Sequence, residues 1–175
     1  MYVIVRVKGT IRVIPDIKKT LELLVLNHCN HCVLVDETPQ MKGMLQKAKD
    51  YITWGEIEAP ILSKLLKYRG RVEGDKHLTP EILKAATGSE SFDDIAIALI
   101  GNKVVFREIE KKMGMKRVMR LHPPAKGYEG IKRSYRAGGA MGYRGADINK
   151  LIARMLATDE PKVEGAGKTS KKAVS

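Results

Sequence analysis

In the first 57 residues, segments with the hydrophobic spacing of a strand alternate with segments that have the spacing of a helix. Tyr2 to Lys8 is rich in β-branched residues and ends at Gly9, which predicts a strand. Pro15 followed by Asp16 predicts the start of a helix, because proline suits the first turn and an acidic side chain suits the positive end of the helix dipole. Four apolar residues of this helix have the spacing of one buried stripe: Ile17, Leu21, Leu24 and Val25.

The same alternation continues to Trp54. Val33 to Val35 predicts a short second strand, and Met41 to Ala48 predicts a second, shorter amphipathic helix. Tyr51 to Trp54 predicts a third strand. We therefore predict an α+β fold whose core is a two-layer β-α-β-α-β module, with both helices on one face of the sheet.

Helical patterns dominate residues 58–101. One helix is expected over Ile57 to Tyr68, and a second is expected to begin with Thr79 as its cap. A third is expected from Ser91 to Ile100. The sequence leaves open whether this helical extension packs on the module or projects from it as an arm. Its 6 basic and 7 acidic residues nearly cancel, which favours packing or contact with protein over contact with a polyanion.

The chain after residue 101 combines a strand, a basic segment and a final helix. Val118 to Leu121 predicts a strand that ends before Pro123. Asp147 is expected to cap the last helix, whose apolar residues fall on one stripe: Ile148, Leu151, Ile152, Met155 and Leu156. Residues 158–175 are rich in Lys, Ser, Gly and Ala without a pattern, and we expect them to be disordered. The expected organisation has four parts: a core module (1–57), a helical extension (58–101), a basic segment with the final helix (102–157) and a tail (158–175).

Positive charge is concentrated in the last part of the chain. The formal net charge is +12 over 175 residues. Residues 102–160 hold 14 basic and 6 acidic side chains, whereas residues 1–57 hold 8 and 6. Such asymmetry indicates a polyanionic partner, either nucleic acid or an acidic membrane surface.

The hydrophobic pattern disfavours a membrane or secreted protein. The longest uninterrupted apolar run is Ile95 to Ile100, whereas a bilayer-spanning helix needs about 20 apolar residues. The amino terminus has no apolar run before a small-residue cleavage site. The two cysteines, Cys29 and Cys32, are too close together to staple a fold, which is typical of a reducing compartment. We expect a cytoplasmic protein.

The stretch from Arg120 to Arg144 carries the strongest functional signal. Its 25 residues include six Lys/Arg, one acid, five glycines and three tyrosines, and no clear apolar period runs through it. Cationic groups neutralise phosphates, glycines allow close approach of the backbone, and tyrosines such as Tyr135 and Tyr143 can stack on bases or riboses. We predict a basic, glycine-rich loop that becomes ordered on RNA. A second basic cluster lies around the first turn and helix: Lys8, Arg12, Lys18 and Lys19.

His28, Cys29, His31 and Cys32 form the best candidate for metal chemistry. Structural zinc sites usually draw ligand pairs from two separate segments, because four neighbouring side chains cannot all converge on a tetrahedral ion. We therefore predict no metal here, and we expect Cys32 to be a small buried residue at a helix-to-strand junction.

No motif requires an enzyme or a cofactor. Residues 165–170 resemble the end of a phosphate-binding loop, but Lys162 stands where the pattern requires its first glycine. Paired acids such as Asp93 and Asp94 are explained by helix starts. We predict a non-enzymatic protein with neither a cofactor nor a small-molecule substrate.

Short motifs in a characteristic order resemble a known family. They are Asn30-His31-Cys32-x-Leu34-Val35, Lys42-Gly43-Met44, Gly55-Glu56, Arg120-Leu121-His122-Pro123-Pro124, Gly130-Ile131-Lys132, the pair Gly138-Gly139, and Asp147 to Ile152. Over about residues 1–157 the chain is similar to the archaeal form of the large-subunit ribosomal protein family called L-thirty in bacteria and L-seven in eukaryotes. His28-Cys29 and the lysine-rich tail after Thr158 depart from the family pattern.

The resemblance implies a structural, RNA-binding protein of the large ribosomal subunit. It implies an antiparallel sheet in the module, contact with large-subunit ribosomal RNA, neighbouring ribosomal proteins as partners, and an approach of the extra archaeal segments to the 5S ribosomal RNA. The basic field and the resemblance together give these candidate RNA-binding residues: Lys8, Arg12, Lys18, Lys42, Arg117, Arg120, His122, Lys126, Lys132, Arg133, Tyr135, Arg136, Gly138, Gly139 and Arg144. Two alternatives remain open: a small metal-binding protein or enzyme that uses the cluster from His28 to Cys32, and a nucleic-acid chaperone outside the ribosome.

Overall fold

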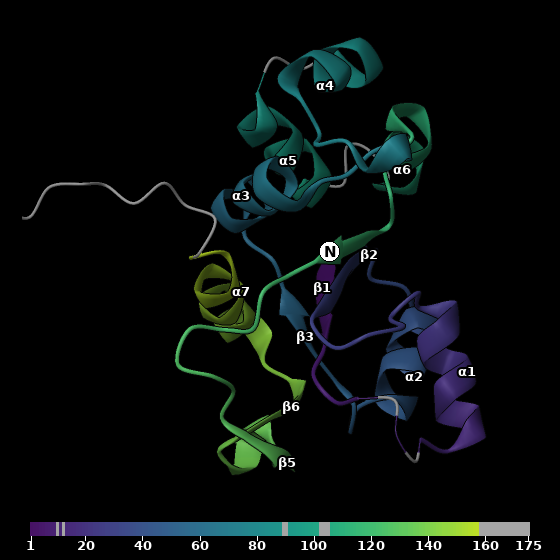
Figure 1. The fold of residues 1–175 in the computed structure, drawn as a ribbon, viewed down its shortest axis with the longest axis vertical. Coiled ribbons are helices and arrows are strands. Elements are labelled where there is room, and N and C mark those ends of the chain that lie inside the picture. The colour runs from purple at the N-terminus through teal and green to yellow at the C-terminus, as the bar shows by residue number, and fades with distance from the viewer. Residues whose placement is uncertain (10, 12, 89–90, 102–105, 158–175) are drawn as a thin grey trace, which may run out of the picture.

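The computed structural model describes residues 1–9, 11, 13–88, 91–101 and 106–157, and it shows a sheet with helices on both of its faces (Figure 1). The core module has the predicted order: β1 (Tyr2–Arg6), α1 (Pro15–Leu23), β2 (His31–Val35), α2 (Pro39–Lys47) and β3 (Ile52–Glu56). Strand β1 lies between β2 and β3 and is antiparallel to both. The prediction of an antiparallel β-α-β-α-β module in an α+β fold is confirmed.

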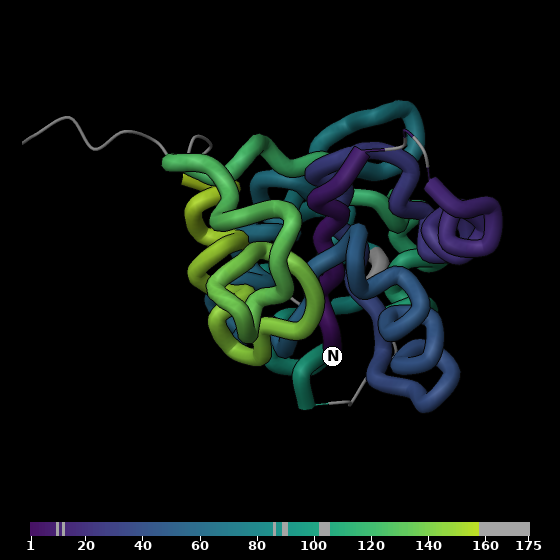
Figure 2. The backbone as a smooth tube through the Cα atoms, turned by 90° about the horizontal axis from the view of Figure 1, so that it is seen from below, coloured from purple at the N-terminus to yellow at the C-terminus, as the bar shows by residue number. Residues whose placement is uncertain are grey.

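Strand β1 is buried on both faces, which explains why it lacks an apolar–polar alternation. Tyr2 and Ile4 belong to a cluster with apolar residues of α1 and α2. Val3 and Val5 point to the other face and belong to a second, larger cluster. In Figure 2, α1 and α2 lie to one side of β1, and the carboxyl-terminal strands with the last helix lie to the other.

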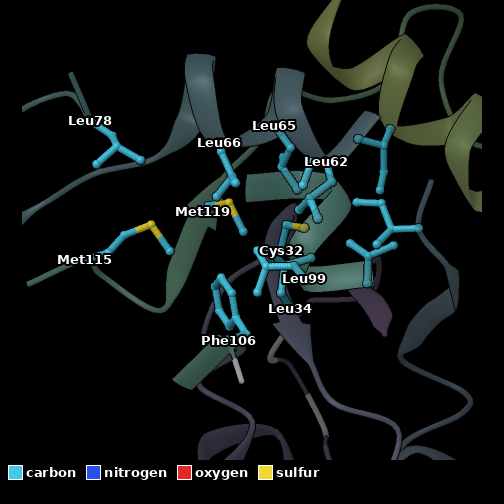
Figure 3. Packing of buried hydrophobic residues seen from close by; sticks show 14 of the residues in the cluster. Cys32, Leu34, Leu62, Leu65, Leu66, Leu78, Leu99, Phe106, Met115 and Met119 are labelled. Carbon is cyan, nitrogen blue, oxygen red and sulfur yellow. The ribbon is translucent and has the colours of Figure 1, made fainter. Parts of the chain in front are cut away.

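The second face of the sheet is covered by the helical extension, the helix that follows it and the last helix. These helices are α3 (Ala59–Arg69), α4 (Pro80–Thr87), α5 (Phe92–Ile100), α6 (Phe106–Met113) and α7 (Ile148–Leu156). Figure 3 shows Leu62 and Leu65 of α3 with Leu99 of α5 gathered around Cys32 and Leu34 of β2. The extension therefore packs on the module, and its helices add a third layer to the two that the module forms.

Three further strands widen the sheet to the order β4-β2-β1-β3-β6-β5. The predicted strand β4 (Val118–Arg120) is antiparallel to β2, whereas β5 (Gly130–Ser134) and β6 (Gly139–Tyr143) follow in parallel pairing beyond β3. The prediction of a loop is wrong for β5 and β6. Ala140 and Met141 of β6 are buried, but two adjacent residues between glycines are too few to give a recognisable period.

The helix starts follow the sequence signals in part. Thr38 and Ser91 cap α2 and α5, because each side chain accepts a hydrogen bond from a main-chain N–H in the first turn. Thr79 and Asp147 hold the cap positions of α4 and α7, yet neither side chain makes a capping bond. Helix α1 ends at Leu23, so Val25, with φ of 59°, lies beyond the helix and not on its stripe. The stripe of α7 is buried at all five predicted positions.

Three single 3-10 turns complete the secondary structure of the described residues: Glu73–Asp75, Tyr135–Ala137 and Gly145–Asp147. The last of them contacts β3 at Gly55. A Cβ atom built on Gly55 would overlap the main-chain carbonyl oxygen of Gly145 and would lie 3.0 Å from Cγ2 of Ile148. Only a glycine therefore lets the start of α7 approach β3 this closely.

We predict that Gly55→Ala destabilises the protein by about 2 kcal/mol or more, because main-chain atoms yield less readily than a flexible side chain to an added methyl group. The midpoint of urea unfolding, followed by circular dichroism, measures the change.

Gly43→Ala is the matched control. Gly43 is exposed within α2, and an added Cβ would meet no atom within 4 Å. Alanine should therefore stabilise this helix by about 0.5–1 kcal/mol. If the urea midpoint of Gly55→Ala equals or exceeds that of Gly43→Ala, the close approach of α7 to β3 at Gly55 is contradicted.

Candidate nucleic-acid interface

Strand β5 forms one edge of the sheet, and all five of its residues are exposed. Lys132 and Arg133 lie on this strand, and Arg136 lies exposed in the turn that follows. No acidic residue occurs between Glu129 and Asp147. The strand therefore presents cationic side chains, together with the outward main-chain groups of an edge strand, to whatever approaches from this side.

Gly138 and Gly139 hold this edge in place. Gly138 has φ of 75°, in the left-handed region that glycine adopts without strain. A Cβ on the buried Gly139 would overlap the main-chain carbonyl group of Arg133. The two glycines thus set the tight turn and the close pairing of β5 with β6. The approach of their backbone to phosphate stays a prediction.

Arg144 is buried, with only 7% of its surface exposed. Its Nε donates to Oγ1 of Thr53 at 3.0 Å, and its Nη2 donates to Oε2 of Glu129 at 2.7 Å. The guanidinium carbon also lies 4.6 Å from the centre of the Tyr135 ring. Because these contacts join β3, the end of β6 and the segment before β5, Arg144 acts as an internal clamp.

Glu129 is the carboxylate that this clamp requires. Burial raises its pKa, but the hydrogen bond and positive charge of Arg144, with the charge of Arg154, more than offset that effect. The pKa of Glu129 therefore lies below its ordinary value near 4.5. Arg154 of α7 also donates to Oε1 of Glu129 at 3.2 Å, so this one carboxylate links the last helix to the basic segment.

Tyr135 and Tyr143, two of the three tyrosines of the segment, differ in their availability to a ligand. Tyr135 donates its hydroxyl to Oδ2 of Asp147 at 2.8 Å, a bond that raises the pKa of the phenol, and its ring packs on Arg144. Tyr143 is 43% exposed, and its ring lies 6.3 Å from that of Trp54. A hollow of about 410 Å³ opens beside these rings, and Lys49 and Arg136 also line it. This aromatic hollow adjoins the β5 edge. No pattern in the sequence marks Lys49 or Trp54 as part of a binding site.

The other predicted residues lie apart from β5. Lys8 is half-buried, with its Nζ 5.5 Å from the centre of the Tyr51 ring. Lys18 and Lys42 are exposed on α1 and α2, and Lys42 pairs with Glu37 at 2.6 Å. Arg12 lies outside the described residues.

The remaining candidates follow the chain from α6 toward β5. Arg117 precedes β4 and Arg120 ends it, at the opposite edge of the sheet from β5. His122 and Lys126 are exposed in the connection between β4 and β5. Those predicted residues that the structure describes thus lie on both sheet edges, in the connection between β4 and β5, and near α1 and α2.

The cluster from His28 to Cys32 does not converge. Cys32 is fully buried in the larger core cluster, and burial raises the pKa of its thiol, whereas Cys29 is exposed. In the part of the chain that the structure describes, no three His, Cys, Asp or Glu side chains are grouped so that they could hold a metal ion. None of the helices described here has the length and apolar character to cross a membrane. Residues 158–175, with their phosphate-loop-like sequence, lie outside the described part.

Comparison with known proteins places this arrangement among ribosomal proteins. The family model of ribosomal protein L30p/L7e matches residues 2–52. The large ribosomal subunit protein uL30 of Methanocorpusculum labreanum is 45% identical over 155 residues, which are 89% of this chain and 99% of that protein. The proteins of the same name from Thermoplasma volcanium and Methanobrevibacter smithii are 50% and 45% identical over 156 residues, 89% of this chain and 93% and 100% of theirs. The similarity therefore extends well beyond the core module.

We predict that Arg144→Ala lowers the free energy of unfolding by about 2–3 kcal/mol, because it removes charge-assisted hydrogen bonds and leaves Glu129 without its buried partner. Arg133→Ala, on the exposed edge, should change stability by less than about 0.5 kcal/mol. Urea unfolding of both variants beside the parent checks the contrast, and equal midpoints would refute the clamp.

The effect of Arg144→Ala should also depend on pH. A carboxyl group whose pKa is lowered in the folded state contributes stability that is fully present above its ordinary pKa and is lost as the pH falls through the folded value. The stability difference between parent and Arg144→Ala should therefore be largest near neutral pH and should narrow below about pH 4.5, the ordinary pKa of Glu129. A difference that stays constant down to pH 3 would show that the destabilisation arises from packing alone.

Proposed function

The chain belongs to the ribosomal protein L30p/L7e family, and we propose that it is a structural, non-enzymatic component of the large ribosomal subunit in the cytoplasm. In that role it binds large-subunit ribosomal RNA, with the 5S ribosomal RNA as a further target, and it supports translation as part of the ribonucleoprotein.

The observation that carries the RNA-binding proposal is the exposed basic edge at β5. Its cationic side chains are Lys132 and Arg133, with Arg136 in the turn that follows. Cations along an edge strand can follow a phosphate backbone, and neutralising phosphates releases condensed counterions, which favours binding. The large net charge of +12 supports long-range attraction to RNA.

The aromatic hollow gives this edge a means of contacting bases or riboses. Tyr143 offers a partly exposed ring, and its hydroxyl is held by Glu56 at 2.6 Å, so the ring is positioned before any RNA arrives. A base turned out of its stack can pack on such a ring, with Lys49 and Arg136 near its phosphates. Recognition would then combine phosphate contacts on β5 with one stacking position beside it.

We predict that the double variant Lys132→Ala, Arg133→Ala binds large-subunit ribosomal RNA more weakly and with a shallower salt dependence. Removing a cation that neutralises one phosphate should reduce the slope of log affinity against log salt by about one. Filter binding to purified large-subunit ribosomal RNA of an archaeal relative, at several salt concentrations, measures both quantities.

Lys84→Ala is the matched control, because Lys84 is an exposed cation on α4, at the end of the molecule far from β5 (Figure 1). Its affinity and salt slope should equal those of the parent. Equal slopes for the double variant and the parent would exclude β5 from the interface. Release of the parent protein from large subunits in a low-salt wash would instead favour a nucleic-acid chaperone outside the ribosome.

A further inference from the structure

A second basic site lies at the β4 edge of the sheet, opposite β5. There, a cleft of about 510 Å³ opens between the loop that joins α1 to β2, the end of α3 and the chain that enters β4. Five of its lining side chains are cationic: Arg69, Arg71, Lys116, Arg117 and Arg120. Asp75 is the single carboxylate among its lining residues. We call this site the β4 cleft.

Main-chain hydrogen bonds hold the walls of the β4 cleft together. The N–H of Lys116 donates to the carbonyl oxygen of Arg71 at 2.7 Å, and Val72 pairs with Met115 in an isolated bridge. His31 of β2 lies opposite Arg120 in the β2–β4 ladder. Segments far apart in sequence thus bring their cations to fixed positions before a ligand binds.

Asp75 offsets only part of this charge. Its carboxylate lies 2.7 Å from Nζ of Lys116 and 3.7 Å from Nη1 of Arg120, and the hydrogen bond from Lys116 lowers its pKa. One carboxylate among five cations leaves a strongly positive cleft. Burial is the main cause that lowers the pKa of the His31 imidazole. The positive charges of His28, Arg120 and Arg6 lower this pKa further.

Two buried nitrogens in the β4 cleft have no hydrogen-bond partner within the described structure. They are Nε of Arg117 and Nδ1 of His31. Leaving a buried polar group unpaired costs about 1–3 kcal/mol, so native proteins rarely retain one without a reason. Nε of an arginine always carries a hydrogen, so a ligand with an acceptor oxygen in reach of Arg117 would satisfy it.

We propose that the β4 cleft binds a phosphate of an RNA strand, with the attached nucleotide turned into the cleft. This inference rests on the proposed ribosomal function and adds to it a second contact with RNA. The volume of the β4 cleft, about 510 Å³, lies within the range of about 300–1,000 Å³ that is typical of small-ligand sites. Guanidinium groups suit phosphate because they form paired hydrogen bonds with its oxygens. Val25 and Val118 supply an apolar wall for the ribose or base.

Directed cleavage of RNA tests the proposal on the full-length protein. Cys29 is exposed next to His28 of the cleft, whereas Cys32 is buried, so an iron–EDTA tether attaches at one position of the unaltered chain. The Cys29→Ser, Ser134→Cys variant carries the same tether on the β5 edge. Each labelled protein is assembled with large-subunit ribosomal RNA of an archaeal relative, and the cut positions are read by primer extension.

We expect two different sets of cuts, one from each edge. The double variant Arg71→Gln, Arg117→Gln should lose the cuts from Cys29, keep those from position 134, and bind the RNA about tenfold more weakly, as expected when charge-assisted hydrogen bonds are removed. Lys112→Gln on the exposed face of α6 is the control and should leave both sets unchanged.

The outcomes separate the two proposals. Cuts from position 134 without cuts from Cys29 would overturn the β4 cleft and leave the β5 interface intact. Absence of binding and of both sets of cuts would overturn the proposed function itself. Protection of Cys29 from maleimide in assembled subunits, without RNA cuts from it, would mean that a neighbouring protein covers the cleft, and would overturn its assignment to RNA.

Discussion

Burial of both faces of β1 is the constraint on which the rest of the structure depends. Its neighbours β2 and β3 satisfy its main-chain hydrogen bonds, but its side chains alternate between two apolar clusters. Helices α1 and α2 cover only one of these, so the module alone would expose Val3, Val5 and Leu34 to water. The helical extension and α7 remove that surface, which is why the near-neutral middle of the chain packs on the sheet.

The position of the basic edge follows from this core through a short sequence of contacts. Gly55 lets the start of α7 approach β3, and β6 pairs with β3 in parallel. Arg144 then ties β6 to Thr53 and to Glu129, and the turn at Gly138 brings β5 alongside. The solvent-facing cations of β5 are therefore positioned by an ion pair whose arginine, Arg144, is buried. Rigid scaffolding of this kind favours binding, because less conformational freedom is lost when the partner arrives.

The sequence predicts those elements whose side chains repeat with a period, namely the β-α-β-α-β module and the stripe of α7. It fails at β5 and β6, where glycines replace the apolar residues that would mark a strand and the pairing partner lies about ninety residues earlier. Charge alone could not separate Arg144, which is internal, from Arg133, which is exposed. The near-zero net charge of residues 58–101 also concealed Arg69 and Arg71, because acidic residues elsewhere in that segment cancel their charge.

The strand order has a mechanical consequence for the assembled particle. Strands β4 and β5 are the first and last of six, and hydrogen-bonded neighbours lie about 4.8 Å apart, so the two basic edges are separated by about 24 Å. The hydrogen-bonded sheet, whose central strand β1 is buried on both faces, resists compression along this direction. With RNA held at both edges, the protein would act as a strut of fixed length, and the spacing of two RNA segments would be set by how many strands lie between them.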